Sequence, residues 1–268
     1  MINGYEIIDA HCHIYPEKIA EKAIHGTDTF YDIVSKRKGT AKDLIDEKHL
    51  SGVDKFVVQS VATTPRQVKS INEFVAGEVA RYSEFLVGLG TLHQDSPDME
   101  GDILHILELG LKGVKLHPDI QNFKVDEERY FPIYELCEKY GLPILMHTGD
   151  YRYDNSNPNR VIPIVETFKN LTFIGAHFGG WSIWEEATKQ LSGYKNFYVD
   201  CSSSLYAISP EKARELIMAY GTDRVLFGTD YPMWNPEDEI ERFLSIDLTE
   251  EQREDIFYNN AAKLFGIN

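Results

Sequence analysis

The chain has 268 residues, of which 43% are hydrophobic, and its 43 acidic and 27 basic residues give a formal net charge of −16. This charge argues against nucleic acid or an anionic membrane surface as the main partner, since both attract basic proteins. The sequence shows no apolar run near the roughly 18 residues of a membrane span, no signal-peptide pattern and no disulfide framework among its three cysteines. We therefore expect a cytoplasmic globular protein.

Eight short apolar runs recur along the chain, with helical patterns between them. Most are rich in Val, Ile, Leu and Phe on both alternating faces, as is typical of parallel strands that are buried on both sides. The runs are 5–10, 53–60, 85–92, 113–117, 143–148, 171–177, 197–202 and 225–230. From the second run onward their C-terminal ends lie 25 to 32 residues apart, a period that fits repeated strand–helix units.

The helical patterns between these runs have recognisable boundaries. The segment 127–140 has an apolar stripe and is followed by glycine, which favours helix C-caps. The segment 210–220 begins with proline behind a serine N-cap, and 249–265 begins with the capping-box pattern Thr-Glu-Glu-Gln. Alternating strands and helices of this kind predict an α/β protein with a parallel sheet.

Eight strand–helix units in a chain of this length predict one domain, a (β/α)8 TIM barrel over residues 1–268. An open doubly wound sheet is the alternative, although it would more often carry a glycine-rich phosphate turn after the first strand, where this chain has two histidines. The connection after the first strand, about residues 14–52, is longer than the others. A loop of this length over the catalytic face is a candidate lid or specificity element.

The first apolar run ends in the sequence Asp9-Ala-His11-Cys-His13. Alternate side chains of a strand share a face, so His11 and His13 would point the same way, roughly 7 Å apart along the strand. Two imidazoles on one strand form half of a divalent-metal site, and neutral imidazole suits zinc and its neighbours. The motif alone can arise by chance, so its interpretation depends on the rest of the chain.

Further ionisable side chains stand at the C-terminal ends of the predicted strands, where barrel enzymes build their active sites. In chain order these residues are Asp9, His11, His13, Lys115, His117, His147, His177 and Asp230. Burying several imidazoles costs desolvation without apolar gain, so their convergence on one barrel mouth indicates function. For Asp9 two roles stay open: orienting a ligand histidine, or making a hydrogen bond at the strand end.

Five motifs carry a resemblance to a known family. They are Asp9-Ala-His11-Cys-His13, Gly113-Val-Lys115-Leu-His117-Pro118, Leu145-Met-His147-Thr-Gly149, Ile174-Gly-Ala-His177-Phe-Gly-Gly180 and Phe227-Gly-Thr-Asp230-Tyr-Pro232. With these motifs in order, the chain resembles the amidohydrolase superfamily. Within it, the chain resembles the amidohydrolase-related (amidohydrolase 2) branch of metal-dependent barrel hydrolases, which also contains amino-carboxymuconate-semialdehyde decarboxylase and related non-oxidative decarboxylases.

The resemblance implies one divalent metal ion held by His11, His13, His147 and Asp230. Zn²⁺ is the ion expected first, with Mn²⁺ and Fe²⁺ as alternatives, because imidazole and carboxylate ligands suit all three. Asp230 would also take a proton from the metal-bound water, and His177 would act as a general acid or base. A second metal bridged by a modified Lys115 is a further alternative, since binuclear members of the superfamily use a lysine on that strand.

Other residues near the strand ends or in the long connection are candidates for substrate binding. They are Arg37, Lys115, His117, Arg152, Tyr151 and Trp234. An arginine can clamp a substrate carboxylate with two parallel hydrogen bonds, and tyrosine and tryptophan can line an aromatic pocket. An ordinary structural or surface role is the alternative for each of them.

Three functions remain open at this point. The first is a metal-dependent hydrolase that attacks an amide, lactone or ester bond of a small molecule with metal-bound hydroxide. The second is a metal-dependent non-oxidative decarboxylase of an aromatic or unsaturated carboxylic acid. The third, from another class, is a non-catalytic metal- or ligand-binding barrel. The expected partner is a small molecule, for which a carboxylate is one option, and the resemblance also suggests a homodimer.

Overall fold

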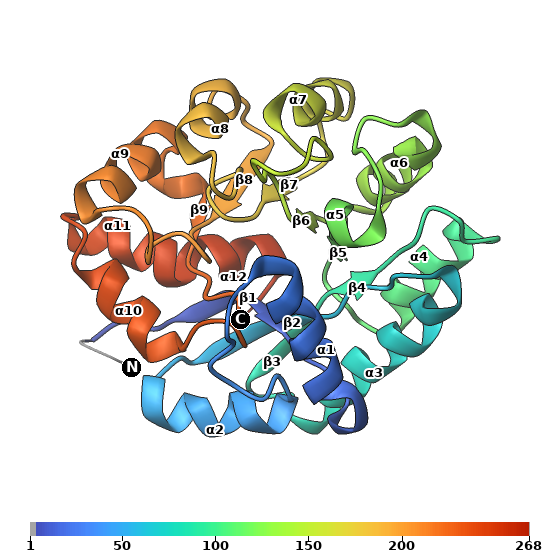
Figure 1. The fold of residues 1–268 in the computed structure, drawn as a ribbon, viewed down its shortest axis with the longest axis horizontal. Coiled ribbons are helices and arrows are strands. Elements are labelled where there is room, and N and C mark those ends of the chain that lie inside the picture. The colour runs from blue at the N-terminus through green and yellow to red at the C-terminus, as the bar shows by residue number, and fades with distance from the viewer. Residues whose placement is uncertain (1–3, 268) are drawn as a thin grey trace.

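The computed structural model describes residues 4–267, which form a closed barrel of parallel strands inside a ring of helices (Figure 1). The predicted α/β TIM barrel is therefore confirmed, and the open doubly wound sheet is not. Residues 1–3 and 268 of the predicted domain lie outside the described part. The barrel matters for function because it brings the carboxyl ends of its strands to one rim.

The strands are short, and each neighbouring pair is parallel. In chain order they are β1 Ile8–His13, β2 Lys55–Gln59, β3 Leu86–Gly88, β4 Gly90–Thr91, β5 Val114–Leu116, β6 Ile144–Met146, β7 Phe173–Gly175, β8 Phe197–Asp200 and β9 Val225–Leu226. β1 lies further along the chain than the predicted run 5–10, because Cys12 and His13 continue the pairing with β2. The two metal-binding candidates of the first motif therefore belong to the strand itself.

The predicted run 85–92 is divided into β3 and β4 at Leu89. The Leu89 backbone N–H donates to the Val58 carbonyl at 2.9 Å, whereas Gly90 donates to the Gly113 carbonyl, also at 2.9 Å. The chain thus exchanges its partner β2 for β5 at this residue. The two sheets, ordered β1-β2-β3 and β4 through β9, are consequently one continuous barrel wall.

The barrel closes between its first and last strands. The Ala10 N–H donates to the Phe227 carbonyl, and the Asp230 N–H donates to the His11 carbonyl, each at 2.9 Å. These bonds lie beside the first histidine motif. The closure therefore sets the position of Asp230 relative to His11.

Helices surround the barrel, and most of them follow a strand. They are α1 Glu17–Tyr31, α2 Ala41–Ser51, α3 Val68–Arg81, α4 Met99–Glu108, α5 Pro118–Gln121, α6 Phe131–Tyr140, α7 Pro158–Thr167, α8 Trp184–Leu191, α9 Pro210–Tyr220, α10 Pro236–Leu244, α11 Glu250–Glu254 and α12 Asn260–Phe265. In residues 4–267, no helix combines the length and the apolar character needed to cross a membrane. Of the predicted helices, 210–220 agrees with α9, and 249–265 contains α11, a π-helical segment at Asp255–Asn259, and α12.

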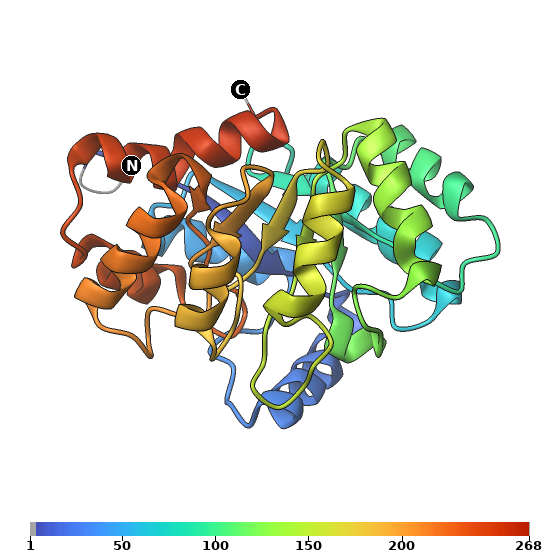
Figure 2. The same cartoon turned by 90° about the horizontal axis from the view of Figure 1, so that it is seen from above.

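The barrel interior is filled by apolar side chains that alternate along the strands. They include Ile8, Ala10, Val57, Leu89, Leu145, Ile174, Ala176 and Leu226, and they pack against Ala261 and Phe265 of α12. Figure 2 shows α1, in blue, at one end of the barrel and the C-terminal helices, in red, at the other. The end of the barrel near α1 is left for the polar side chains at the strand ends.

α10 carries a buried acid whose protonation is coupled to folding. Glu239 is fully buried, and burial raises its pKa to about 7 although Arg242 opposes the shift. Because this value lies above that of a carboxyl in an unfolded chain, folding favours the neutral acid. The resulting stabilisation is present below the unfolded pKa and is lost as the pH rises through about 7.

We therefore expect Glu239→Gln to gain stability relative to the wild type as the pH rises from 5 to 8. The gain should be of order 1–3 kcal/mol, since each pKa unit corresponds to about 1.4 kcal/mol. Urea denaturation of both proteins at several pH values measures it, and effects of other groups cancel in the difference. A difference that does not change with pH would contradict the expectation.

Candidate active site

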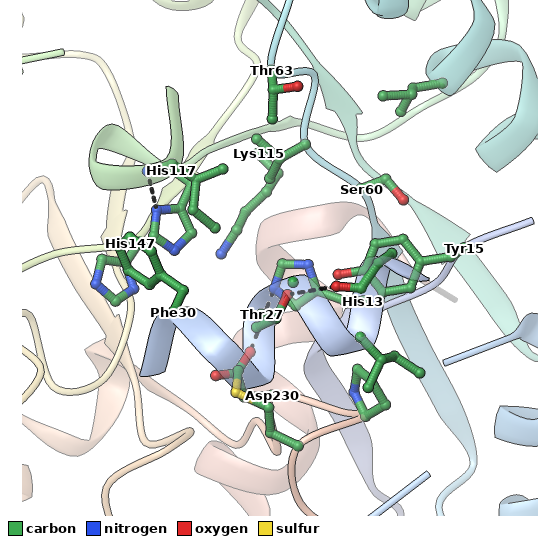
Figure 3. A pocket seen from close by; sticks show the side chains of 18 of the residues that line it. His13, Tyr15, Thr27, Phe30, Ser60, Thr63, Lys115, His117, His147 and Asp230 are labelled. Carbon is green, nitrogen blue, oxygen red and sulfur yellow. Dashed lines mark hydrogen bonds and ion pairs between the residues drawn. The ribbon is translucent and has the colours of Figure 1, made fainter. Parts of the chain in front are cut away.

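A cavity of about 630 Å³ lies between the carboxyl ends of the strands and α1 (Figure 3). Its polar lining includes His11, His13, Lys115, His117, His147, His177 and Asp230. Its apolar lining comes mainly from α1 and α3 and includes Ile19, Ala23, Ile24, Phe30, Ile71 and Phe74. The structure thus gathers the predicted strand-end residues in one place, except Asp9, which is buried outside the cavity lining. The long connection after β1 supplies part of the wall, and its role as a lid stays a prediction.

Three buried side chains, those of His11, His13 and Asp230, bring together atoms that could bind a metal ion, and we call them the donor cluster. His11 Nε2 lies 3.2 Å from His13 Nε2 and 3.3 Å from Asp230 Oδ1, and His13 Nε2 lies 3.4 Å from the same oxygen. Ligand atoms held about 2.0–2.2 Å from one divalent ion are spaced in this way. These residues form one of the clusters in residues 4–267 that could hold a metal ion. The three donors match three of the four ligands that the resemblance implies.

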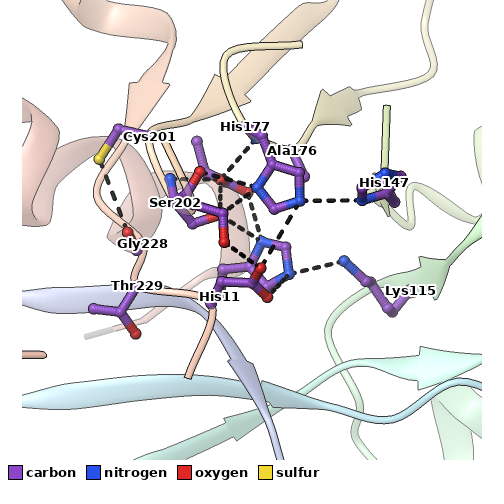
Figure 4. A network of polar contacts seen from close by, with 12 residues as sticks. His11, Lys115, His147, Ala176, His177, Cys201, Ser202, Gly228 and Thr229 are labelled. Carbon is purple, nitrogen blue, oxygen red and sulfur yellow. Dashed lines mark hydrogen bonds and ion pairs between the residues drawn. The ribbon is translucent and has the colours of Figure 1, made fainter. Parts of the chain in front are cut away.

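Asp200, at the end of β8, fixes the orientation of the first candidate ligand, His11. Figure 4 shows the His11 ring between Ser202 and Lys115. His11 Nδ1 donates to Asp200 Oδ2 at 2.9 Å, so Nε2 keeps its lone pair for the donor cluster. Burial alone would raise the pKa of Asp200, but the interaction with His11 holds it below its usual range. Asp9 does not contact a histidine ring in this way. It accepts hydrogen bonds from the backbone N–H groups of His11 and Thr229, so of its two predicted roles the structure shows the hydrogen bond at the strand end.

His177 and His147 form a second pair beside the donor cluster. His177 Nδ1 donates to the Ser202 carbonyl at 2.9 Å, and His177 Nε2 lies 3.1 Å from His147 Nδ1. His177 Nε2 is 4.0 Å from Asp230 Oδ2, so this pair faces the donors without joining them. His147 is therefore next to the three-donor cluster and outside it. His177 and Asp230 also both have a positive φ, 61° and 63°, a strained conformation that often marks functional residues.

Lys115 extends from β5 into the cavity, and Figure 3 shows its side chain between His117 and His13. It is 1% exposed, and its Nζ donates to His11 Nε2 at 2.9 Å. Burial lowers the pKa of Lys115 to about 8, while Asp230 and Asp200 oppose the shift. The amine is a cation close to the donor cluster at neutral pH. The alternative of a second, lysine-bridged metal stays a prediction.

His117 contacts the long connection through the last residue of α1. Its Nδ1 accepts from the Ile120 N–H at 3.3 Å, so in the neutral ring Nε2 carries the proton. That Nε2 lies 2.8 Å from the Tyr31 hydroxyl and donates to it. The rings of His117 and His147 stack with centroids 4.2 Å apart. His117 thus contacts both the end of α1, through Tyr31, and the pair formed by His147 and His177, through its stacking on His147.

The two predicted arginine clamps have protein partners. Arg37 forms an ion pair with Glu47 and donates from Nε to Asn235 at 2.8 Å, away from the cavity lining. Arg152 donates to both oxygens of Asp150 and to the Phe30 carbonyl, which anchors the end of α1. Neither guanidinium therefore has all of its N–H groups free to bind a substrate carboxylate. Their role in substrate binding stays a prediction.

The two predicted aromatic residues differ in position. Tyr151 is 73% exposed and does not line the cavity. Trp234 lines a small adjoining hollow, where its indole N–H donates to Ser203 Oγ at 2.9 Å. Ser203 in turn donates to Asp230 Oδ2 at 2.6 Å. Trp234 is thus linked to Asp230 of the donor cluster by two hydrogen bonds through Ser203.

Sequence reasoning missed several residues of this site. Asp200 lies near the end of the predicted strand 197–202 and ends the observed strand β8, so its position close to a strand end was a usable indication. Ser202 and Ser203 follow one residue later: the Ser202 hydroxyl contacts His11 and His177, and the Ser203 hydroxyl donates to Asp230. Tyr31 lies inside the long connection, where no strand pattern marks it. Its contact with the site depends on how α1 packs.

Comparisons with known proteins agree with this architecture. Among curated proteins, the chain is 24% identical to a 2-amino-3-carboxymuconate-6-semialdehyde decarboxylase of Dictyostelium discoideum, with 74% of this chain and just under two thirds (66%) of that protein covered. It is 22% identical to a gamma-resorcylate decarboxylase of Polaromonas, with 79% of this chain and 80% of that protein covered. Both relatives are named as decarboxylases.

Solved structures show the same fold. An uncharacterised TIM-barrel protein of Bordetella bronchiseptica superimposes with a TM-score of 0.80 at 22% identity, covering 98% of this chain and 99% of that one. A dihydroxybenzoic acid decarboxylase of Polaromonas, with bound manganese and the inhibitor 2-nitroresorcinol, gives a TM-score of 0.74 at 15% identity, with 98% of each chain covered. The family model described as Amidohydrolase matches residues 8–267. The chain therefore belongs to the amidohydrolase family.

Proposed function

We propose that this protein is a metal-dependent non-oxidative decarboxylase of an aromatic or unsaturated carboxylic acid. The observation that carries the proposal is a largely apolar cavity that ends in a cluster of cation donors and a buried lysine. The decarboxylase names of both curated relatives favour this function over the hydrolase that was expected first. The Polaromonas structure further indicates which ligands suit such a site, a divalent metal and a small aromatic compound.

The residues present fit a divalent ion. His11, His13 and Asp230 supply two neutral nitrogens and one carboxylate at mutual distances of 3.2 to 3.4 Å. His147 would complete the set through its Nδ1, the nitrogen that lies 3.1 Å from His177 Nε2. Such an ion would supply positive charge that polarises the substrate. Donors of this kind suit Zn²⁺ and Mn²⁺, and manganese is the ion in the Polaromonas decarboxylase.

Side chains of the protein bind the substrate and supply the proton. The Lys115 ammonium attracts the substrate carboxylate, and the apolar side chains of α1 and α3 hold the rest of the molecule and exclude water. The bond between the carboxyl carbon and its neighbour breaks, and the electron pair stays on that neighbouring carbon. His177, which keeps its own proton on Nδ1, takes a second proton from solvent on Nε2 and delivers it to the same carbon, so one carboxylate and one proton give carbon dioxide and the shortened product.

The direct test is carbon dioxide release by the metal-loaded protein. Purified protein is reconstituted with Mn²⁺ or Zn²⁺ and incubated with a panel of acids that includes 2,6-dihydroxybenzoate, the ligand in one structure of similar fold. Carbon dioxide formed in equal amount to the acid consumed supports the proposal. Cleavage of a parallel panel of lactones, esters and amides without carbon dioxide would replace it with the hydrolase. Tight metal binding without any turnover would favour the binding barrel.

Lys115→Met is expected to raise KM for the acid about 10- to 100-fold, with a smaller change in kcat. The reason is that a hydrogen bond to a charged group contributes about 1.5–3 kcal/mol, and methionine keeps the volume without the charge. Steady-state kinetics measure the effect. The control is Lys112→Met, an exposed lysine just before the same strand. An unchanged KM would show that the carboxylate binds elsewhere.

A further inference from the structure

A carboxylate outside the predicted set lies against His147. Asp119 Oδ2 is 3.5 Å from His147 Nε2, and the two side chains are only 1% and 3% exposed. Within residues 4–267, neither of these two buried atoms has a hydrogen-bond partner. Buried polar atoms almost always have one, so this pair is incomplete as it stands.

Asp119 is held so that only one of its oxygens is free to face the histidine. It lies in α5, directly after the strand that carries Lys115. Asn155 donates from Nδ2 to Asp119 Oδ1 at 2.8 Å, which leaves Oδ2 for His147. The His147 ring cannot turn away easily, because it stacks on His117 with an interplanar angle of 6°.

The hydrogen bonds on the other side of His147 indicate what occupies its Nδ1. Because a carbonyl only accepts, the Ser202 carbonyl places the proton of neutral His177 on Nδ1. His177 Nε2 then presents a lone pair toward His147 Nδ1, 3.1 Å away. Either a proton or a cation must therefore lie at His147 Nδ1. If a cation binds there, neutral His147 carries its proton on Nε2, next to Asp119.

We propose that Asp119 is a positioning residue for His147: its Oδ2 accepts the Nε2 proton and leaves the Nδ1 lone pair for the divalent ion. The arrangement repeats that of His11, whose Nδ1 donates to Asp200 while Nε2 faces the donor cluster. Metal-binding histidines commonly donate their second N–H to a carboxylate, which fixes the tautomer and makes the ring a better ligand. The inference builds on the proposed cation site but does not depend on the reaction catalysed there.

Asp119→Asn tests this role, because Asn155 dictates how the new amide lies. The amide carbonyl takes the place of Oδ1 and keeps the hydrogen bond from Asn155, so the NH₂ group faces His147 Nε2. That group favours the wrong tautomer, with the proton on Nδ1. Calorimetric titration of the metal-free protein with Zn²⁺ should show about 10- to 100-fold weaker binding than in the wild type.

The double variant Asp119→Asn/Asn155→Asp is the matched control. The new carboxylate at position 155 accepts from the NH₂ group of the new amide and turns the amide carbonyl toward His147. Most of the lost Zn²⁺ affinity should then return, which a merely structural role would not produce. Asp126→Asn, in which a nearby carboxylate paired with Arg160 is neutralised, should bind Zn²⁺ like the wild type.

The tautomer itself can be observed. Long-range ¹H–¹⁵N spectra of the Zn²⁺-loaded wild type should show His147 protonated at Nε2. Unchanged Zn²⁺ affinity in Asp119→Asn, or no recovery in the double variant, would overturn the proposal. If the wild type bound no Zn²⁺, the cation site itself would be wrong. If it bound Zn²⁺ with the expected variant pattern but released no carbon dioxide, only the proposed reaction would fail.

Discussion

Asp230→Asn is expected to lower kcat by about three orders of magnitude or more, equivalent to at least about 4 kcal/mol, and to abolish tight binding of a divalent ion. Asp230 supplies the only carboxylate of the three-donor cluster, and its Oδ1 lies 3.3 and 3.4 Å from the two histidine nitrogens. Asparagine has nearly the same shape but no charge. The interaction with His11 holds the pKa of Asp230 well below its usual range despite burial, so the native group is ionised at neutral pH.

Metal content and turnover should be measured on the same preparations. Elemental analysis should find about one equivalent of metal in the wild type and far less in Asp230→Asn. Asp247→Asn, which changes a 98% exposed aspartate, serves as the control for the same chemical change. If Asp230→Asn kept a full equivalent of metal and its activity fell less than tenfold, Asp230 would not be a ligand.

His177→Asn is expected to lower kcat about 10²- to 10⁴-fold while metal affinity changes little. His177 Nε2 lies beside the donor cluster, 4.0 Å from Asp230 Oδ2, where it can carry a proton without holding the ion. Asparagine tolerates the positive φ of 61° at this position better than most residues, so the loop should keep its shape.

Two measurements separate proton transfer from metal binding in this variant. The first compares Zn²⁺ affinity with kcat, and only kcat should fall. The second adds imidazole to the solution, which should restore part of the activity by replacing the missing ring. His105→Asn on α4, outside the cavity lining, is the control. Parallel losses of metal and activity would make His177 a ligand instead of a proton carrier.

Buried parallel strands could be located from sequence because burial on both faces leaves a continuous apolar run. The break at Leu89 could not, since it arises where one strand exchanges its neighbour in space. The last run, 225–230, was predicted too long, because beyond Leu226 the chain pairs irregularly with the first strand as it places Asp230. Helix α9 was predicted to the residue, since proline, serine and glycine mark its ends locally.

In the candidate site, too, features set by the local sequence could be predicted, whereas features set by tertiary packing could not. Histidines at strand ends could be assigned to one rim because the barrel brings all such ends together. Asp119 and Tyr31 could not, since neither belongs to a strand and each reaches its histidine only through tertiary packing. Which nitrogen of each imidazole is free was likewise beyond the sequence. That choice depends on partners such as Asp200 and the Ser202 carbonyl.

The closure of the barrel has a consequence for biosynthesis. His11 and His13 belong to the first strand and Asp230 follows the last, so more than 200 residues separate them in the chain. At ordinary rates of translation, about 10 to 40 s pass between their emergence from the ribosome. A nascent or prematurely terminated chain therefore holds only part of the donor set. Because an ion stabilises only the state that binds it, an ion at the proposed cation site would selectively protect completed chains from degradation.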